Sequence, residues 1–327
     1  MSAYRSFLIT GGAGFIGSHL AERLAETGGK VTVLDTAAVR QDHVTDQRIR
    51  HVRGSVTDRQ LVDRLVEEHD CIFHLAALLG VKRTMDQPAE MIENNLLGTI
   101  HVLQAALKHK KRVVFASSSE VYGKSPPPFS EQSDHLYGPT SKMRWSYATA
   151  KFLEEFLCLG YVKKGAKVSV VRYFNVYGPR QKSGLYGGAI PKFIKAALRG
   201  EDITVYGDGS QTRCFTFITD AVEATIAAAG DQAVGEIINI GNDEEVAISD
   251  LAQMIKDISN SPSQIVNVPF EQVYPEGFEE IPRRLPDTSK MRSLLKVHPQ
   301  TGLRQGLLFT VRWYRNEESA VCAEGGR

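Results

Sequence analysis

The sequence predicts an α/β protein with a doubly wound parallel sheet and a smaller C-terminal substrate-binding lobe. From Ser6 to about Arg172, short apolar segments alternate with helical segments, which is the pattern of repeated βαβ units. A glycine-rich turn joins the first apolar segment to the first helical one, as in Rossmann-type folds. After Asn175 the pattern becomes irregular and richer in Gly and Pro, which indicates a separate lobe.

The first part of the chain is predicted to contain regularly alternating strands and helices. The expected strands are 7–10, 31–35, 71–77, 112–119 and 168–174. The expected helices are 18–26, 61–68, 99–108 and 147–161.

These segments suggest how the chain divides into domains. Residues 1–172 would form a Rossmann domain and residues 173–327 the lobe. Apolar stretches reappear within 214–245, so part of that segment is expected to return to the Rossmann domain. Residues 316–327 lack a periodic apolar face and are expected to form a frayed tail.

Composition limits the kinds of partner that the protein can bind. The chain has 327 residues, 42% of them hydrophobic, and a net charge of +1. This balance provides no global field for binding nucleic acid or an anionic membrane. No apolar run approaches the roughly 20 residues that a membrane span requires. The first residues lead directly into a strand rather than a signal peptide, so a cytoplasmic protein is expected.

The cysteines predict neither a metal site nor a disulfide scaffold. Cys71, Cys158, Cys214 and Cys322 are scattered along the chain, without the close spacing of zinc ligands. We therefore expect reduced thiols and no bound metal.

The glycine-rich turn predicts a binding site for a dinucleotide. Gly11, Gly14 and Gly17 lie between the strand FLIT and an amphipathic helix. In this context one glycine turns the chain, one lets the backbone approach a pyrophosphate, and one lets the helix pack on the strand. The helix N-terminus adds unpaired N–H groups and a partial positive charge.

Asp35, at the end of the second expected strand, favours NAD over NADP. Asp35 ends the segment VTVLD, where its carboxylate can accept hydrogen bonds from a ribose diol and would repel a 2′-phosphate. Asp35 could instead simply cap a turn. Asp58 falls where a side chain could contact the adenine. The Rossmann domain is therefore expected to bind NAD.

A tyrosine and a lysine predict acid–base chemistry. Tyr147 and Lys151 are four residues apart, so on a helix they share one face. The strand RVVFA leads into Ser117, Ser118, Ser119 and Glu120, at the edge where a parallel sheet places its ligands. A tyrosine base needs its phenolate stabilised, because its ordinary pKa is about 10. Tyr-x-x-x-Lys alone is usually a solvated helix face, but the glycine turn and the serines favour catalysis.

Together these residues resemble the extended short-chain dehydrogenase/reductase family, which contains nucleotide-sugar epimerases, dehydratases and decarboxylases. The resemblance covers nearly the whole chain. Its motifs are TGGAGFIGSH, Asp35, Asp58, HLAA from His74, NLLGT from Asn95, SSSEVYG, Tyr147 with Lys151, RYFNVYGPR and RRLPD.

The resemblance implies roles for individual residues. Tyr147 would be the base for a sugar hydroxyl, Lys151 would lower its pKa and hold the nicotinamide ribose, and Ser118 would hydrogen-bond the reacting oxygen. The implied cofactor-binding residues are Gly11, Gly14, Phe15, Ile16, Gly17, Asp35, Asp58, Leu75, Ala76, Ala77, Asn95, Tyr147 and Lys151. The implied substrate-binding residues are Asn175, Arg180, Tyr206, Arg213 and Arg284.

The pair Ser119–Glu120 distinguishes among the possible reactions. A 4-epimerase needs no carboxylate beside Ser118, whereas a 4,6-dehydratase usually has an acidic pair at these positions. Ser-Glu instead resembles the UDP-glucuronate decarboxylases, which implies that Arg284 would face the uronate carboxylate, with Ser119 and Glu120 as its catalytic partners. Ser118 departs from the threonine usual in those enzymes. The segment ALLGVKRT after HLAA also departs from them, and it borders the sugar pocket.

The first hypothesis is therefore UDP-glucuronate decarboxylase-like chemistry through a transient 4-keto sugar. A UDP-hexose or UDP-glucuronate 4-epimerase is the alternative, and a nucleotide-sugar dehydratase comes third. A catalytically silent NAD-binding regulator is a non-enzyme hypothesis, against which the intact Ser118, Tyr147 and Lys151 argue. The resemblance also implies a homodimer that pairs through the helical stretches 90–108 and 146–161.

Overall fold

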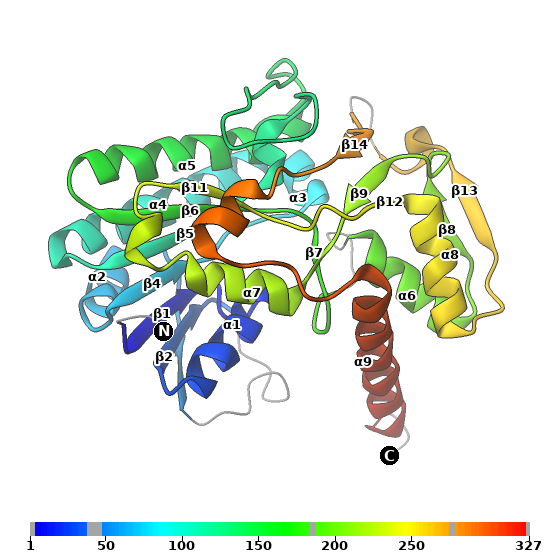
Figure 1. The fold of residues 1–327 in the computed structure, drawn as a ribbon, viewed down its shortest axis with the longest axis horizontal. Coiled ribbons are helices and arrows are strands. Elements are labelled where there is room, and N and C mark those ends of the chain that lie inside the picture. Colours follow the sequence, from blue (N-terminus) through cyan, green and yellow to red (C-terminus); the bar gives the residue numbers. More distant parts are fainter. Residues whose placement is uncertain (1–3, 38–47, 183–187, 275–278, 325–327) are drawn as a thin grey trace.

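The protein is built around a seven-stranded sheet with strand order β11-β6-β5-β4-β1-β2-β3 (Figure 1). The computed structural model describes residues 4–37, 48–182, 188–274 and 279–324, with only the backbone described for 81–83 and 319–324. Neighbouring strands of this sheet all run parallel. The strands are β1 (Ser6–Thr10), β2 (Lys30–Asp35), β3 (Ile49–Arg53), β4 (Cys71–His74), β5 (Arg112–Ser118), β6 (Lys167–Tyr173) and β11 (Ile237–Ile240). This topology confirms the predicted Rossmann-type α/β fold.

Helices cover both faces of the large sheet, and alternate residues of each central strand pack on opposite faces. In β1, Phe7 and Ile9 belong to one buried cluster with α1 and α7, whereas Leu8 belongs to another with α2, α4 and α5. The helices are α1 (Phe15–Glu26), α2 (Arg59–Glu67), α3 (Val81–Asp86), α4 (Pro88–His109), α5 (Ser146–Lys163) and α7 (Ile218–Ala227). Burial on both faces explains why the central strands are almost continuously apolar.

The chain crosses back to the large sheet after entering the smaller lobe. β11 pairs in parallel with β6, and α7 packs against α1. Both elements lie within the segment 214–245, part of which was expected to return. We propose that residues 1–172 form one domain and residues 173–327 the other, with α7 and β11 of the second packed on the first.

The smaller lobe contains short strands and helices beside the carboxyl edge of the large sheet (Figure 1). Its strands form three small sheets with the orders β12-β9-β14, β13-β8 and β10-β7. The elements are β7 (Val176–Tyr177), α6 (Ala189–Arg199), β8 (Ile203–Tyr206), β9 (Thr212–Cys214), β10 (Thr216–Phe217), β12 (Glu245–Ala247), α8 (Ile248–Ser259), β13 (Ile265–Val268) and β14 (Arg283–Arg284).

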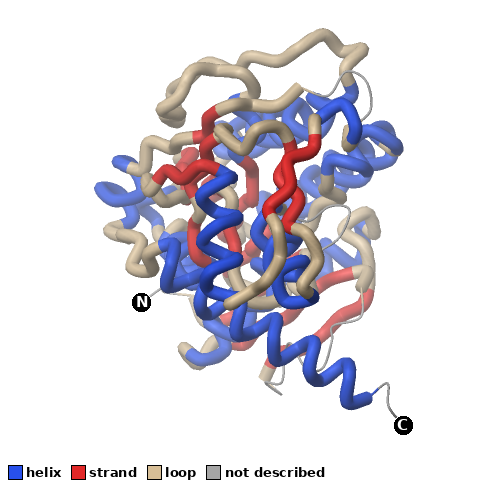
Figure 2. Tube along the Cα trace, turned by 90° about the vertical axis from the view of Figure 1, so that its right-hand side faces the viewer, coloured by secondary structure: helices blue, strands red, loops and turns tan. Residues whose placement is uncertain are grey.

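The last helix, α9 (Leu303–Glu324), corrects one expectation. Residues 316–324 were expected to fray, but they continue this helix, which Figure 2 shows running to the C-terminal end. The first half of α9 buries Leu303, Leu307, Val311 and Tyr314 at helical spacing, and this packing anchors the helix that the following residues extend. None of the described helices combines the length and the hydropathy that a membrane span needs.

Candidate active site

The strands of the large sheet bring the predicted site residues to one edge. Thr10, His74 and Ser118 are the last residues of β1, β4 and β5. Because these strands are parallel, their carboxyl ends meet at the same edge, where open α/β sheets bind ligands.

The glycine turn fits the pyrophosphate of a dinucleotide. Gly11 has φ of +73°, and a Cβ there would lie 2.7 Å from the backbone nitrogen of Ala76. A Cβ at Gly17 would lie 2.5 Å from the carbonyl oxygen of Gly11, so only glycine lets α1 pack so closely on the turn. Gly14 begins α1 without a side-chain cap. The N–H groups of Phe15 and Ile16, in the first turn, therefore remain available for an anion.

Asp35 lies beside this turn, at the end of β2. Its Oδ2 accepts a hydrogen bond from the backbone N–H of Ala13 at 3.0 Å, and its Oδ1 accepts one from Ala37 at 2.9 Å. The carboxylate is thus held next to the glycine turn, where the proposed ribose contact requires it. Asp58 instead caps α2, because its Oδ1 accepts from the N–H of Leu61 at 3.0 Å. Its predicted contact with adenine stays a prediction.

The segment Leu75–Ala77 follows β4 and borders the glycine turn. The N–H of Leu75 donates to the carbonyl of Thr10 at 3.1 Å. Asn95 is 1% exposed and holds the next residue, Leu78, with both ends of its amide. Its Oδ1 accepts from the Leu78 N–H at 2.7 Å, and its Nδ2 donates to the Leu78 carbonyl at 3.0 Å. Asn95 thus shapes the loop, and direct contact with the cofactor stays a prediction.

Tyr147 and Ser118 come together at the start of α5, and Lys151 lies one turn further along the same helix. The Tyr147 hydroxyl has Ser118 as a hydrogen-bonding partner. The Lys151 ammonium is almost fully buried and lies 4.6 Å from the centre of the Phe115 ring. Burial and the negative charges of Glu154 and Glu120 raise the pKa of Tyr147, while the hydrogen bond with Ser118 lowers it. Tyr147 therefore needs additional positive charge at the site before it can act as a base near neutral pH.

Glu120 links two arginines from distant parts of the chain. Its Oε1 pairs with Arg284 Nη1 at 2.5 Å, and its Oε2 pairs with Arg144 Nη2 at 2.8 Å. Burial alone would raise the pKa of Glu120, but the two guanidinium groups outweigh burial and hold this pKa well below its usual range. Glu120 is consequently ionised at neutral pH. Ser119 is buried beside it, in the same 3₁₀ turn.

Arg144 was not predicted from the sequence. It lies in a 3₁₀ turn, Met143–Trp145, that leads directly into α5. Arg144 is 6% exposed. The available signal was its position three residues before Tyr147, which places both side chains within one turn of the active-site edge.

A cavity of about 320 Å³ lies in the smaller lobe. Three predicted substrate-binding residues, Asn175, Tyr206 and Arg213, line it. Burial and the charge of Arg284 lower the pKa of Arg213 to about 10, and Glu280 opposes this effect. Lining residues that sequence reasoning missed are Gln181, Lys192, Gln211, Phe270 and Tyr274.

The two remaining predicted substrate residues lie outside this cavity. Arg284 pairs with Arg213 in the register of β14 and β9, so it connects the cavity to Glu120. Arg180 instead makes two contacts with Glu22 of α1, at 2.8 and 2.9 Å. The structure does not bring Arg180 into the cavity, and its role in substrate binding stays a prediction.

The described cysteines are buried thiols to which no catalytic role is assigned. Cys71, Cys158 and Cys214 are free and buried. Cys322 lies where no side chains are described. Among the described residues no group of His, Cys, Asp and Glu side chains could hold a metal ion.

The position of Asp35 predicts a preference for NAD over NADP. A 2′-phosphate would lie against the Asp35 carboxylate, so NADP should bind at least about tenfold more weakly. Titration of the cofactor-free protein with each nucleotide measures the two affinities. Asp35→Asn should narrow the difference, because it removes the charge and keeps the size. Equal or tighter binding of NADP to the unaltered protein would contradict the proposed role.

Similar proteins include decarboxylases and an epimerase. The chain is 55% identical to UDP-N-acetyl-alpha-D-glucosaminuronate decarboxylase of Bacillus cytotoxicus, over 95% of this chain and 98% of that protein. It is 34% identical to UDP-glucuronic acid decarboxylase 1 of Danio rerio, over 96% of this chain and 73% of that protein. The crystal structure of a UDP-glucuronic acid 4-epimerase from Bacillus cereus, in complex with UDP-glucuronic acid and NAD, has a TM-score of 0.84 at 29% identity. It covers 95% of this chain and 99% of that one.

The family assignment agrees with the geometry described above. Residues 7–241 match the NAD dependent epimerase/dehydratase family. This span includes the glycine turn, Asp35, Ser118 to Glu120, Tyr147 and Lys151, all of which lie at or near one edge of the sheet. The chain therefore belongs to the NAD dependent epimerase/dehydratase family.

Proposed function

We propose that the protein is an NAD-dependent decarboxylase of a UDP-linked uronic acid. The observation that carries this proposal is the ion-paired cluster of Glu120, Arg144 and Arg284 beside Tyr147 and Ser118. A uronate carboxylate needs a cation to orient it, and Arg284 can supply one. The 55% identity to a UDP-N-acetylglucosaminuronate decarboxylase, over nearly the whole of both chains, supports the same reaction.

The cofactor would be held by the glycine turn, Asp35 and Lys151, all at the carboxyl edge of the sheet. When bound, NAD would supply oxidation of the sugar at C4, and its positive charge would favour the phenolate form of Tyr147. Tyr147 would take the proton from the C4 hydroxyl, and Ser118 would hold the same oxygen through a hydrogen bond. Lys151 would stabilise the phenolate and bind the nicotinamide ribose.

Loss of CO2 follows from the position of the ketone. A ketone at C4 makes the C6 carboxylate a β-keto acid, in which the C5–C6 bond breaks as CO2 leaves and its electrons pass to the C4 oxygen. Tyr147 and Ser118, which would both hydrogen-bond the C4 oxygen, would stabilise its negative charge. C5 then takes up a proton. Arg284 would hold the carboxylate before cleavage, and Glu120, paired with both arginines, would keep their guanidinium groups in place.

The cavity in the smaller lobe would bind the nucleoside diphosphate. Arg213 and Lys192 provide positive charge for the phosphates, and α6 begins at this cavity with Gly188, which has no side-chain cap. Tyr206 and Tyr274 pack edge to face with ring centres 5.8 Å apart, which provides an aromatic wall for a base. Arg213 lies beside Arg284, so a diphosphate in the cavity would place the sugar toward Glu120 and Tyr147.

Two uronates are the main candidate substrates. UDP-N-acetylglucosaminuronate comes first, because the relative that is 55% identical is named for it. UDP-glucuronate, the substrate expected from the sequence motifs, comes second and is named in a relative that is 34% identical. The two differ at C2 of the sugar. The segment 77–84 departs from the UDP-glucuronate decarboxylases. We propose that it contacts the C2 substituent and distinguishes the two substrates.

The experiment that tests the function uses both uronates and the corresponding UDP-hexoses. The protein with NAD should convert at least one uronate to a product lighter by CO2 if the hydride returns to C4, or by CO2 and two hydrogens if the 4-ketone is released, measured by mass spectrometry and by trapping of the released gas. UDP-N-acetylglucosaminuronate should react with the higher kcat/KM. UDP-uronate 4-epimerisation is the alternative, favoured by the similarity to the Bacillus cereus epimerase. A product of unchanged mass would establish this alternative and contradict decarboxylation.

We also propose that the protein forms a homodimer through α4 and α5. These helices pack together and carry exposed apolar side chains, with Leu97 46%, Leu153 45% and Phe156 59% exposed. Light scattering should give twice the monomer mass of 36.1 kDa, and Phe156→Glu should shift the protein toward monomer. Phe309→Glu on α9, at a side chain 44% exposed, is the matched control and should leave the dimer intact. A monomer mass for the unaltered protein at micromolar concentrations would refute the proposal.

A further inference from the structure

A buried carboxylate that the reaction does not use lies next to Lys151. Glu154 is three residues further along α5, and its side chain is fully buried. Its Oε2 lies 3.2 Å from the Lys151 ammonium. Burying a carboxylate is costly unless it is paired and hydrogen-bonded, so its surroundings must hold it in place.

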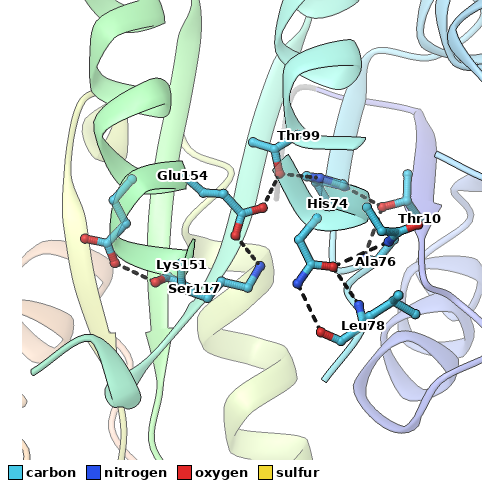
Figure 3. Close-up of polar contacts among 11 residues, drawn as sticks. Thr10, His74, Ala76, Leu78, Thr99, Ser117, Lys151 and Glu154 are labelled. Carbon is cyan, nitrogen blue, oxygen red and sulfur yellow. Dashed lines mark hydrogen bonds and ion pairs between the residues drawn. The ribbon is translucent and has the colours of Figure 1, made fainter. Parts of the chain in front are cut away.

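A chain of hydrogen bonds connects Glu154 to the loop beside the glycine turn (Figure 3). Thr99 of α4 donates to Glu154 Oε1 at 2.5 Å. The oxygen of Thr99 lies 3.1 Å from His74 Nε2, and His74 Nδ1 lies 2.7 Å from the hydroxyl of Thr10. The N–H of Ala76 donates to that hydroxyl at 3.3 Å. The chain thus runs from the segment Leu75–Ala77 to Lys151.

The donors in this chain all point toward Glu154. Because Thr99 gives its proton to the carboxylate, its oxygen must accept from His74, which assigns the imidazole proton to Nε2. Nδ1 is then an acceptor, and Thr10 donates to it. Burial and the charge of Lys151 lower the pKa of His74 to about 3, so the ring is neutral, as this arrangement requires. Successive donors aligned on a carboxylate stabilise its ionised form.

We propose that Glu154 is a positioning residue that fixes the Lys151 ammonium relative to Tyr147 and is itself held by the Thr99–His74–Thr10 chain. This inference rests on the proposed function, in which Tyr147 and Lys151 are the catalytic pair. Lys151 has a flexible side chain, and one ion pair on its own helix restricts where its ammonium can lie. The chain also ties that position to the loop that borders the glycine turn.

Glu154 has a second effect, which makes its role measurable. Its negative charge is among the causes that raise the pKa of Tyr147, opposite in direction to the effect of the hydrogen bond with Ser118. Removing this charge should therefore lower the pKa at which Tyr147 becomes a base. Among the described side chains, the charged and titratable groups that face this part of the site are Lys151, Glu154 and Cys158 of α5, His74 of β4, Glu120 and Arg144.

The test compares the pH dependence of turnover in Glu154→Gln and in the unaltered holoenzyme. The variant should lose about 10- to 100-fold in kcat at the plateau, because Lys151 is misplaced. Its acid limb should move to lower pH, because the loss of the full negative charge of Glu154 outweighs the small displacement of Lys151, which by itself would move the limb to higher pH. Glu154→Asp, which restores the charge, should return the limb toward that of the unaltered enzyme. An acid limb that stays in place in Glu154→Gln would overturn the proposal, even if the rate falls.

Two further variants separate this role from a purely structural one. Glu155→Gln is the matched control, since Glu155 is equally buried on α5 but binds Arg172 and Ser117. It should lower thermal stability and leave the limb in place. Thr99→Val keeps both charges and removes one donor, so kcat should fall severalfold with an unmoved limb. Thr99→Val with unaltered kcat and KM would overturn the role of the chain. If Tyr147→Phe kept full activity, the proposed function would fail instead.

Discussion

Tyr147→Phe is expected to reduce turnover by about 10²–10⁴-fold or more, because it removes the group that takes the proton from the sugar hydroxyl. The substitution deletes one oxygen and little volume, and Tyr147 is only partly buried, so the fold should be unaffected. The affinities for NAD and for the nucleotide-sugar should stay close to those of the unaltered protein.

The measurement is kcat with the better of the two uronates, alongside calorimetric titrations of NAD and UDP. Tyr161→Phe is the matched control, because Tyr161 lies on the same helix near its far end, where Lys164 rests over its ring. The control should keep its activity. A Tyr147→Phe variant that retained most of its turnover would show that another group is the base.

The pH dependence of this reaction has a predictable sign. In the structure, burial together with Glu154 and Glu120 raises the pKa of Tyr147. The rate should rise with pH, because Tyr147 acts as a base only after it loses its proton, and it should reach a plateau above the pKa of Tyr147. The positive charges of Lys151 and of the bound nicotinamide should lower this pKa and so bring the plateau to lower pH.

Most of the large sheet could be predicted because its central strands are buried on both faces. Such strands are continuously apolar in sequence, as in β1, β5 and β6. β3 (Ile49–Arg53) was missed, because it lies at the edge of the sheet and only Ile49 is buried. An edge strand of polar residues gives no apolar signal. The prediction that the tail of α9 frays was wrong for a similar reason. Its residues carry no periodic apolar pattern, and the helix extends into them from the packed first half.

The catalytic pair could be predicted because its parts are close in sequence. Tyr147 and Lys151 share one face of a helix, and the glycine turn occupies a short segment between a strand and a helix. Contacts between distant segments could not be predicted in this way. The pairing of Arg284 with Glu120 was implied only by the family resemblance. The pairing of Arg144 with Glu120 and that of Arg180 with Glu22 were not predicted, because the fold brings these partners together from separate segments.

Glu120→Gln is expected to separate decarboxylation from epimerisation. In the structure Glu120 is an ionised carboxylate that holds Arg284 and Arg144 at once, because these arginines keep its pKa below the usual range. An incoming uronate carboxylate competes for Arg284, and the loss of one arginine would raise the pKa of Glu120. Glu120 could then exchange a proton with C5. Glutamine keeps the shape of the side chain but can neither hold both arginines as ion pairs nor transfer a proton.

For a decarboxylase, Glu120→Gln should therefore lower kcat by about 10²–10⁴-fold with the uronate, and release of CO2 should fall in step. Affinity for NAD should be unchanged. Glu245→Gln is the matched control, since Glu245 pairs at 2.7 and 2.8 Å with Arg283, the exposed neighbour of Arg284 on β14. A surface pair of this kind contributes little, so the control should keep its activity. For a 4-epimerase, Glu120→Gln should be mild and the product mass unchanged, because no bond to C6 is broken. That outcome would leave the fold and the family in place and remove the decarboxylation hypothesis.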